Sequence, residues 1–233
     1  MRHRALLVLA GVGLFACGTP KAPPPPPPPA ATAPHGHGHH GQGFHHRFDG
    51  AEGWAKVFDA PDRDEWQKPE LVMAELGLSP TSLVADVGAG TGYFSVRIAR
   101  VVTRGKVFAI DVEADMVRYL GERAKRESLP GIVPVKADSD DPKIPEPVDV
   151  ILVVDTLHHI GEREAYFAKL RSKLLPRGRI VIVDFAKNAT MGPPPAHRLT
   201  PEDVLSVAQK AGLTKVKEVS LPQQYVLVLA PSS

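Results

Sequence analysis

Residues 83–92 read LVADVGAGTG, and this segment carries the strongest indication of the fold. Residues 83–87 form an apolar run of strand length that only Asp86 interrupts. Three glycines follow at alternate positions, and an amphipathic stretch over about 93–102 predicts a helix. A strand that turns through glycines into a helix is typical of a doubly wound α/β sheet, where the turn lies beside a bound ligand.

Apolar runs and amphipathic segments continue to alternate toward the carboxyl end. The predicted helices are 114–127, 163–175 and 201–211, and the predicted strands are 106–110, 132–135, 148–154, 179–184, 216–221 and 225–230. The last two strands are close enough in sequence to pair antiparallel. We therefore predict a doubly wound, seven-stranded, mostly parallel α/β sheet that ends in an antiparallel hairpin.

The residues of the glycine-rich turn distinguish a dinucleotide ligand from a ligand with an amino-acid part. The dinucleotide fingerprint G-x-G-x-x-G requires glycine where Tyr93 stands, which disfavours a nucleotide-binding oxidoreductase. Asp86 would repel a pyrophosphate but would attract the ammonium group of an amino acid. Asp111 lies 19 residues after Gly92, at the end of the second strand, where a carboxylate accepts hydrogen bonds from a ribose diol. These residues predict a ligand with both amino-acid and nucleoside parts.

At these motifs the chain resembles the class I S-adenosylmethionine-dependent methyltransferases, and the resemblance covers about residues 66–229. It implies S-adenosylmethionine as the cofactor, with the glycine-rich turn around its methionine and ribose portions. It also implies that Asp111 holds the ribose hydroxyls and that Asp138 binds the amine of the adenine. The implied cofactor-binding residues are Asp86, Gly88, Ala89, Gly90, Gly92, Asp111, Val112, Asp138 and Asp155.

The segment Asp155-Thr156-Leu157-His158-His159-Ile160 follows the fourth strand. It is similar to the D-x-x-H-H loop of the small-molecule and ubiquinone/menaquinone-biosynthesis-like branch, where this loop lines the acceptor pocket. A histidine with a pKa near neutrality suits the removal of a proton from an acceptor. His158 or His159 is therefore the candidate base, with Asp155 orienting it. The alternative for either histidine is a packing role or a backbone hydrogen bond.

Two flanking segments are candidates to close the site. Residues 48–80 stand where the family has a variable helical lid, in which Trp66 either covers the cofactor or anchors the lid. On the other side, Thr200 and Pro201 predict the N-cap and first turn of a helix. His197, just before them, either contacts the acceptor or is structural.

Residues 1–17 resemble a bacterial lipoprotein signal. A 12-residue apolar run over 5–16 follows a basic start and precedes Cys17, the chain's single cysteine. Such a run suits a signal peptide better than a membrane-spanning helix. We expect a lipidated Cys17 and attachment to the membrane of the bacterial cell envelope. The alternatives are an ordinary signal peptide, an uncleaved anchor, or a cytoplasmic protein.

Residues 18–47 have the composition of a linker ahead of a methyltransferase domain at 48–233. Seven consecutive prolines at 23–29 favour an extended rod, and six of the ten histidines fall among glycines at 35–46. The second tract is typical of a disordered segment. Its imidazoles could bind zinc, nickel or copper, but without a fixed spacing they predict no metal site.

Composition narrows the functional classes. A net charge of +2, from 28 basic and 26 acidic residues, gives no expectation of nucleic acid, and no protein partner is predicted. With a single cysteine, an intramolecular disulfide and the thiol chemistry of arsenite methylation are disfavoured. The leading prediction is transfer of a methyl group to an unidentified small molecule. The alternative is a membrane-tethered, non-catalytic binding or metal-handling lipoprotein, because S-adenosylmethionine is made in the cytosol.

Overall fold

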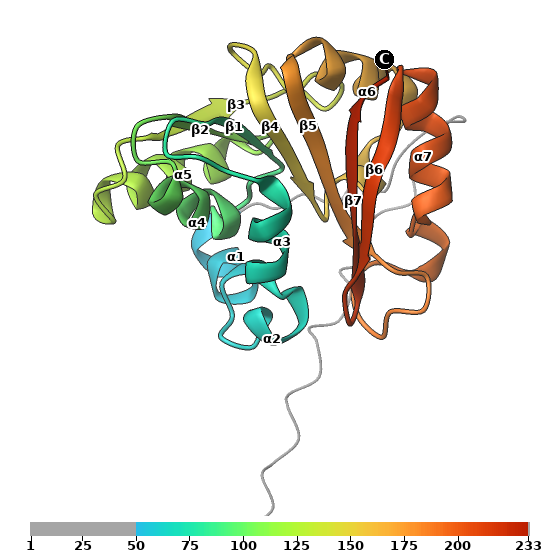
Figure 1. Ribbon diagram of the computed structural model, residues 1–233. Coiled ribbons are helices and arrows are strands. Elements are labelled where there is room, and N and C mark those ends of the chain that lie inside the picture. Colours follow the sequence, from blue (N-terminus) through green and yellow to red (C-terminus); the bar gives the residue numbers. More distant parts are fainter. Residues whose placement is uncertain (1–49, 233) are drawn as a thin grey trace, which may run out of the picture. The chain divides into compact units, whose positions relative to one another are not determined.

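The computed structural model describes residues 50–232, so the predicted signal and linker lie outside the described residues. Seven strands form one sheet in the order β3-β2-β1-β4-β5-β7-β6 (Figure 1). Neighbours from β3 to β5 are parallel, whereas β7 runs antiparallel to both β5 and β6. The predicted fold class is therefore confirmed. The strands are β1 (Leu83–Val87), β2 (Lys106–Asp111), β3 (Ile132–Lys136), β4 (Val148–Val154), β5 (Leu174–Phe185), β6 (Leu213–Ser220) and β7 (Gln224–Pro231).

Helices cover both faces of the sheet, as expected for strands whose residues are apolar on both sides. The predicted cap of the last helix is confirmed, because Thr200 and Asp203 form a reciprocal capping box. The helices are α1 (Ala51–Phe58), α2 (Arg63–Gln67), α3 (Pro69–Leu76), α4 (Tyr93–Val101), α5 (Ala114–Arg126), α6 (Arg163–Ser172) and α7 (Pro201–Lys210), with 3₁₀ turns η1 (Leu157–His159) and η2 (Pro195–His197).

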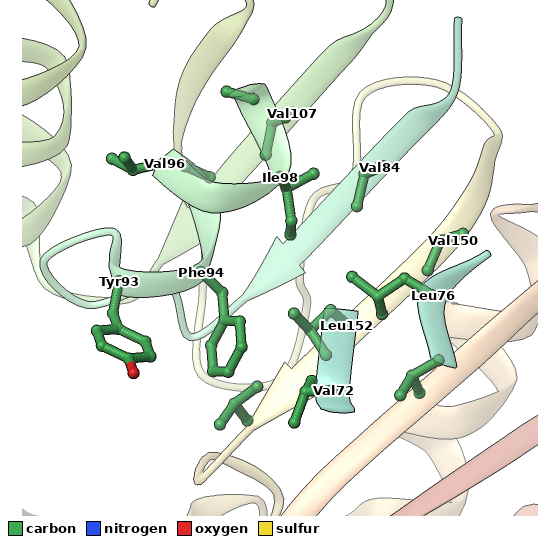
Figure 2. Close-up of a cluster of buried hydrophobic side chains, with 14 of the residues drawn as sticks. Val72, Leu76, Val84, Tyr93, Phe94, Val96, Ile98, Val107, Val150 and Leu152 are labelled. Atoms are coloured by element: carbon green, nitrogen blue, oxygen red, sulfur yellow. The ribbon is translucent and has the colours of Figure 1, made fainter. Parts of the chain in front are cut away.

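Each face of the sheet carries its own layer of core. On one face, Val72 and Leu76 of α3 gather with Val84, Val150 and residues of α4 (Figure 2). Residues of α5 belong to the same layer. The other face packs apolar residues of α6 and α7 against alternate residues of the same strands. This alternation follows from the two-residue period of a strand. The two layers hold the carboxyl ends of the parallel strands at one fixed edge.

Two predicted boundaries need correction. The helix predicted at 163–175 ends at Ser172, because β5 already begins at Leu174, which pairs with Val148 before the register shifts. The strand predicted at 216–221 begins earlier, at Leu213. Gly212 adopts a φ of 74° that ends the preceding turn at once, so strand pairing starts with the next residue.

The helices α1, α2 and α3, which we call the lid (residues 51–76), precede the sheet in sequence. Apart from Val72 and Leu76, polar contacts carry much of their attachment. The Ala51 amide donates to Asp115 at 2.7 Å, and Arg118 and Arg123 of α5 pair with Glu52 and Asp59. The lid is therefore held against α5, beside the carboxyl edge of the sheet. No helix within residues 50–232 is both long and apolar enough to cross a membrane.

Candidate active site

The glycine-rich turn joins the end of β1 to α4. The amides of Gly88 and Ala89 both donate to the carbonyl of Ile110 at 2.9 Å, which fixes the turn to β2. Gly88 has a φ of 75°, and a Cβ there would lie 2.0 Å from Oγ1 of Thr156. Gly90 has a φ of 55°, and a Cβ there would lie 3.4 Å from the ring of Phe58, a lid residue. The turn is therefore bare backbone enclosed between the lid and the loop after β4, an arrangement that lets a ligand approach closely.

Asp111 ends β2 beside this turn. Its Oδ2 accepts from the Gly90 amide and its Oδ1 from the Glu113 amide, each at 2.8 Å. Burial raises the pKa of Asp111. Since a carboxylate oxygen can accept more than one hydrogen bond, both oxygens can still receive a diol. The next residue, Val112, is 46% exposed and offers an apolar surface, while Ala89 is half-buried in the turn.

Asp86 lies within β1, beneath the turn. Only 3% of the residue is exposed, and its Oδ2 accepts from the Ser95 hydroxyl of α4 at 2.6 Å. Burial raises the pKa of Asp86 to about 6, against the hydrogen bond from Ser95. Near pH 7.5 the group is still mainly ionised. It therefore supplies negative charge close to the backbone of the turn.

Asp138 lies just beyond β3, in a different environment. The carbonyl of Asp111 accepts from the Ala137 amide at 2.9 Å, so the end of β3 runs beside the end of β2. The Asp138 side chain is 54% exposed and pairs with Lys143, which lowers its pKa. The predicted contact of Asp138 with adenine stays a prediction.

Asp155 leaves β4 in the left-handed region, with a φ of 51°. Aspartate adopts this region more readily than most non-glycine residues, and such conformations often occur in functional loops. Its Oδ1 accepts from the amide of Gln224, whose oxygen in turn accepts from the amide of Gln67 in the lid. Burial raises the pKa of Asp155 to about 7; Asp184 reinforces this shift and Arg63 opposes it. A chain of side chains thus connects the lid, β7 and the loop after β4.

His158 lies next to a carboxylate, but this carboxylate is Asp184 and not the predicted Asp155. Its Nδ1 lies 2.9 Å from Oδ1 of Asp184, and the two side chains are 4% and 0% exposed. Asp184 stands at the carboxyl end of β5, directly beside β4, whereas Asp155 turns toward Gln224. For His158, the carboxylate that orients the ring is therefore Asp184 and not the predicted Asp155. The ring of His159 lies 4.2 Å from that of His158.

The lid contributes three residues from one face of α2, spaced as helical neighbours. Arg63 donates from Nε and Nη2 to the side-chain oxygen of Gln67 at 3.2 and 3.0 Å. Trp66 stacks on Phe185 of β5 with ring centroids 5.9 Å apart, so it anchors the lid to the sheet. Arg63 and Gln67 were not among the predicted site residues, although their helical spacing from Trp66 was a usable signal. Gln224 is not part of any comparable pattern in the sequence.

The segment after β5 is organised by Arg198 rather than by His197. His197 is exposed in η2, while Arg198 is 6% exposed. The Arg198 guanidinium donates to five backbone carbonyls, those of Ala186, Lys187, Ala189, Met191 and Pro193. A role for His197 with the acceptor stays a prediction. Among residues 50–232, no three His, Cys, Asp or Glu side chains converge as metal ligands.

Comparison with known proteins agrees with this geometry. A family described as "Methyltransferase domain" matches residues 84–178. The crystal structure of an S-adenosylmethionine-dependent methyltransferase from Aquifex aeolicus is 30% identical, with a TM-score of 0.71. The match covers 78% of this chain and 98% of that chain. The chain therefore belongs to the S-adenosylmethionine-dependent methyltransferases, and its cofactor is S-adenosylmethionine.

Two further proteins are similar to the chain at lower sequence identity. The ubiquinone/menaquinone biosynthesis C-methyltransferase UbiE of Cupriavidus taiwanensis is 29% identical over 121 residues, which is 50% of this chain and 49% of that protein. The chain thus spans about half the length of the curated relatives it matches. The [4+2]-cyclase SpnF, 16% identical with a TM-score of 0.62 over 72% of this chain and 81% of its own, shares the fold alone.

The residues of the site fit this cofactor. The turn after β1 has no room for side chains at Gly88, and its glycines adopt left-handed conformations that favour close approach. A carboxylate ends β2, an exposed apolar residue follows it, and Asp86 and Asp155 supply negative charge for a cationic ligand. Individual contacts between these residues and the cofactor remain predictions.

Proposed function

We propose that this chain transfers a methyl group from S-adenosylmethionine to an unidentified small molecule whose reacting atom must lose a proton. The observation that carries the proposal is the buried pair of His158 and Asp184 at the ends of adjacent strands, within reach of the Asp155 charge. The cofactor, when bound, supplies an electrophilic methyl group. The chain's own residues must therefore align the acceptor and accept its proton.

The hydrogen-bond partner of His158 assigns the tautomer of its ring. A carboxylate can only accept, so Nδ1 carries the proton and donates to Asp184. This leaves Nε2 with a free lone pair, which is what a general base requires. The Asp184 charge also stabilises the imidazolium once the acceptor's proton arrives. Hydroxyls, amines and activated carbon acids are acceptors that need such help.

The curated relatives support an acceptor of this kind. UbiE is a C-methyltransferase, and a carbon acceptor also gives up a proton during methylation. The similarity covers only half of each chain, so the acceptor of UbiE is not transferred to this protein. We propose the class of chemistry, a small molecule with a removable proton.

The proposal is tested first by isothermal titration calorimetry of S-adenosylmethionine and S-adenosylhomocysteine into the full chain. A screen of phenols, amines and activated carbon acids follows, with methyl transfer read by mass spectrometry. His158→Gln should lower kcat while leaving cofactor binding intact, and His159→Gln is the matched comparison. If His158→Gln turns over as fast as the wild type, the proposed base is wrong. Cofactor binding without transfer to any acceptor would favour the non-catalytic binding protein.

We further propose that the chain is tethered to a bacterial membrane through lipid on Cys17. The support is the pattern of residues 1–17, in which the single cysteine directly follows the apolar run. Metabolic labelling with a fatty acid should mark the wild type and not Cys17→Ser. If both proteins are unlabelled and fractionate with the cytosol, the tether is ruled out. The same fractionation shows which compartment must supply the cofactor.

A further inference from the structure

Arg63 lies in the lid with its charged group turned into the site. Its side chain is 12% exposed, and its guanidinium lies 3.9 Å from the centre of the Tyr93 ring, directly after the glycine-rich turn. Nη1 donates to the Phe58 carbonyl at 2.6 Å. The ring of Phe58 covers Gly90. Arg63 therefore lies next to the glycine-rich turn and not on the outer surface of the lid.

The hydrogen bonds of Arg63 leave part of its binding capacity unused. Two N–H groups point to Gln67 and one to Phe58, all of them neutral partners, whereas a guanidinium has five N–H groups. The closest carboxylate oxygen, Oδ2 of Asp155, is 4.0 Å from Nη2, beyond hydrogen-bond distance. The faces of the Tyr93 and Trp66 rings and this distant pair compensate the charge only in part, and a buried cation of this kind is stabilised by an anion that binds it directly.

The strand order shows which part of the cofactor lies near this cation. Asp111, which is predicted to hold the ribose, belongs to β2, and β1 and β4 follow β2 across the sheet. A cofactor with its ribose at Asp111 extends its amino-acid end toward β1 and β4, where Arg63 lies 4.0 Å from Asp155 and near enough to Asp86 to oppose the rise in pKa that burial causes there. That end carries two cations, the sulfonium and the ammonium, and one anion, the carboxylate. The two aspartates suit the cations, and Arg63 is the group that suits the anion.

We propose that Arg63 binds the carboxylate of S-adenosylmethionine, and that this contact makes the amino-acid end of the cofactor the ligand that closes the lid. Gln67 positions Arg63 and is joined through Gln224 to Asp155, so the same contact also fixes the loop beside the acceptor. A cofactor analogue without the carboxylate would occupy the nucleoside half of the site but would leave the lid loosely held.

The test compares two ligands that differ in one group, S-adenosylmethionine and decarboxylated S-adenosylmethionine. Their affinities for the full chain are measured by calorimetry, which needs no acceptor and is independent of turnover. The wild type should prefer the carboxylate-bearing ligand by about 10- to 100-fold, the range for a hydrogen bond to a charged group. Arg63→Gln should bring the ratio close to one by weakening S-adenosylmethionine alone.

Arg97→Gln is the matched control, because Arg97 also lies 3.9 Å from the Tyr93 ring but pairs with the exposed Asp64. It should keep the wild-type ratio. Hydrogen exchange over residues 51–76 gives a second readout, and S-adenosylmethionine should protect the lid more than its decarboxylated analogue does. Arg63→Lys keeps the charge and should retain part of the preference, which also covers the case in which Arg63→Gln folds poorly. An unchanged ratio in Arg63→Gln, or a loss confined to acceptor KM, would overturn the proposal.

Discussion

The carboxylate of Asp184 accepts a hydrogen bond from His158 through one oxygen, while its other oxygen has no hydrogen-bond partner in the described part of the chain. Oδ1 accepts from Nδ1 of His158 at 2.9 Å and from the Phe185 amide at 2.8 Å, while Oδ2 is buried and accepts no hydrogen bond among residues 50–232. The side chain lies opposite Tyr225 in the β5–β7 pair, and burial raises the pKa of that tyrosine. Among residues 50–232, the His158 imidazole is therefore the one side chain that hydrogen-bonds the Asp184 carboxylate.

Replacing Asp184 with asparagine should change the chemistry of His158 without changing its place. An amide N–H facing Nδ1 favours the opposite tautomer and removes the charge that stabilises the imidazolium, so kcat should fall by about 10²- to 10⁴-fold. Cofactor affinity should stay within about twofold, as judged against Asp140→Asn at an exposed position. Nitrogen NMR of the ring should show a proton on Nδ1 in the wild type and on Nε2 in the variant. Identical tautomers in both proteins would contradict the assignment.

Cofactor affinity should rise with pH. The pKa is raised to about 7 for Asp155 and to about 6 for Asp86, so both carboxyls become ionised between pH 5.5 and 8. Ionised carboxylates attract a ligand with net positive charge, and affinity should gain about tenfold across this range. Calorimetry at several pH values measures the curve. Asp155→Asn keeps a hydrogen-bond acceptor for Gln224 and should remove only the change in cofactor affinity near pH 7. A wild-type affinity that does not change with pH would refute the electrostatic account.

Stability of the cofactor-free protein should depend on pH in the opposite sense. Because the folded pKa of Asp155 exceeds its value of about 3.8 in an unfolded chain, the folded state binds more protons between these values. This contribution is complete below pH 4 and is lost as the pH rises through 7. Urea unfolding of wild type and Asp155→Asn isolates it, since the variant lacks the titration. Parallel pH profiles for the two proteins would disprove the linkage.

Alanine substitutions at Gly88 and Gly90 should lower the free energy of unfolding by different amounts. A Cβ at Gly88 would overlap Oγ1 of Thr156 at 2.0 Å in addition to its left-handed φ, and should cost about 3 kcal/mol or more. At Gly90 the nearest atom is 3.4 Å away, so the backbone penalty of about 1 kcal/mol dominates. The free energy of unfolding in urea measures both variants. Equal losses would show that the turn shifts to admit a side chain.

The lid should loosen when Arg123 is replaced. Its Nη1 contacts both Asp59 and the Thr91 carbonyl at 2.9 Å, and the side chain is only 15% exposed. Arg123→Gln should increase hydrogen exchange over 51–76 and weaken cofactor binding by about tenfold. Arg100→Gln, at a surface pair with Glu127, is the control and should do neither. Unchanged exchange in both proteins would place the lid's attachment elsewhere.

Much of this fold could be predicted because its signals are local. The apolar run of β4 and the G-x-G-x-G turn after β1 each specify their own structure, and Thr200 caps the helix it precedes. The end of α6 was harder, since the pairing of Leu174 with Val148 overrides a helical pattern. Strand pairing across 26 residues cannot be read from either segment alone.

The site was only partly predictable, for the same reason. The site residues on the glycine-rich turn and on the loop after β4 lie within local sequence motifs, so they could be predicted. Asp184 and Gln224 acquire their partners through the order of strands, which places β4, β5 and β7 side by side. A carboxylate at the end of an apolar strand was a visible hint for Asp184, but the buried amide of Gln224 resembles any surface glutamine in the sequence.

The hydrogen bond between Gln67 and Gln224 joins residues 157 positions apart in the chain. Since a ribosome delivers a chain from its amino end, the lid helices are made long before the strand that holds them. The contacts of the lid with α5 can form earlier, but the link from Gln67 to the loop after β4 is completed only when β7 has paired with β5. Assembly of the enzyme ends with the final strand.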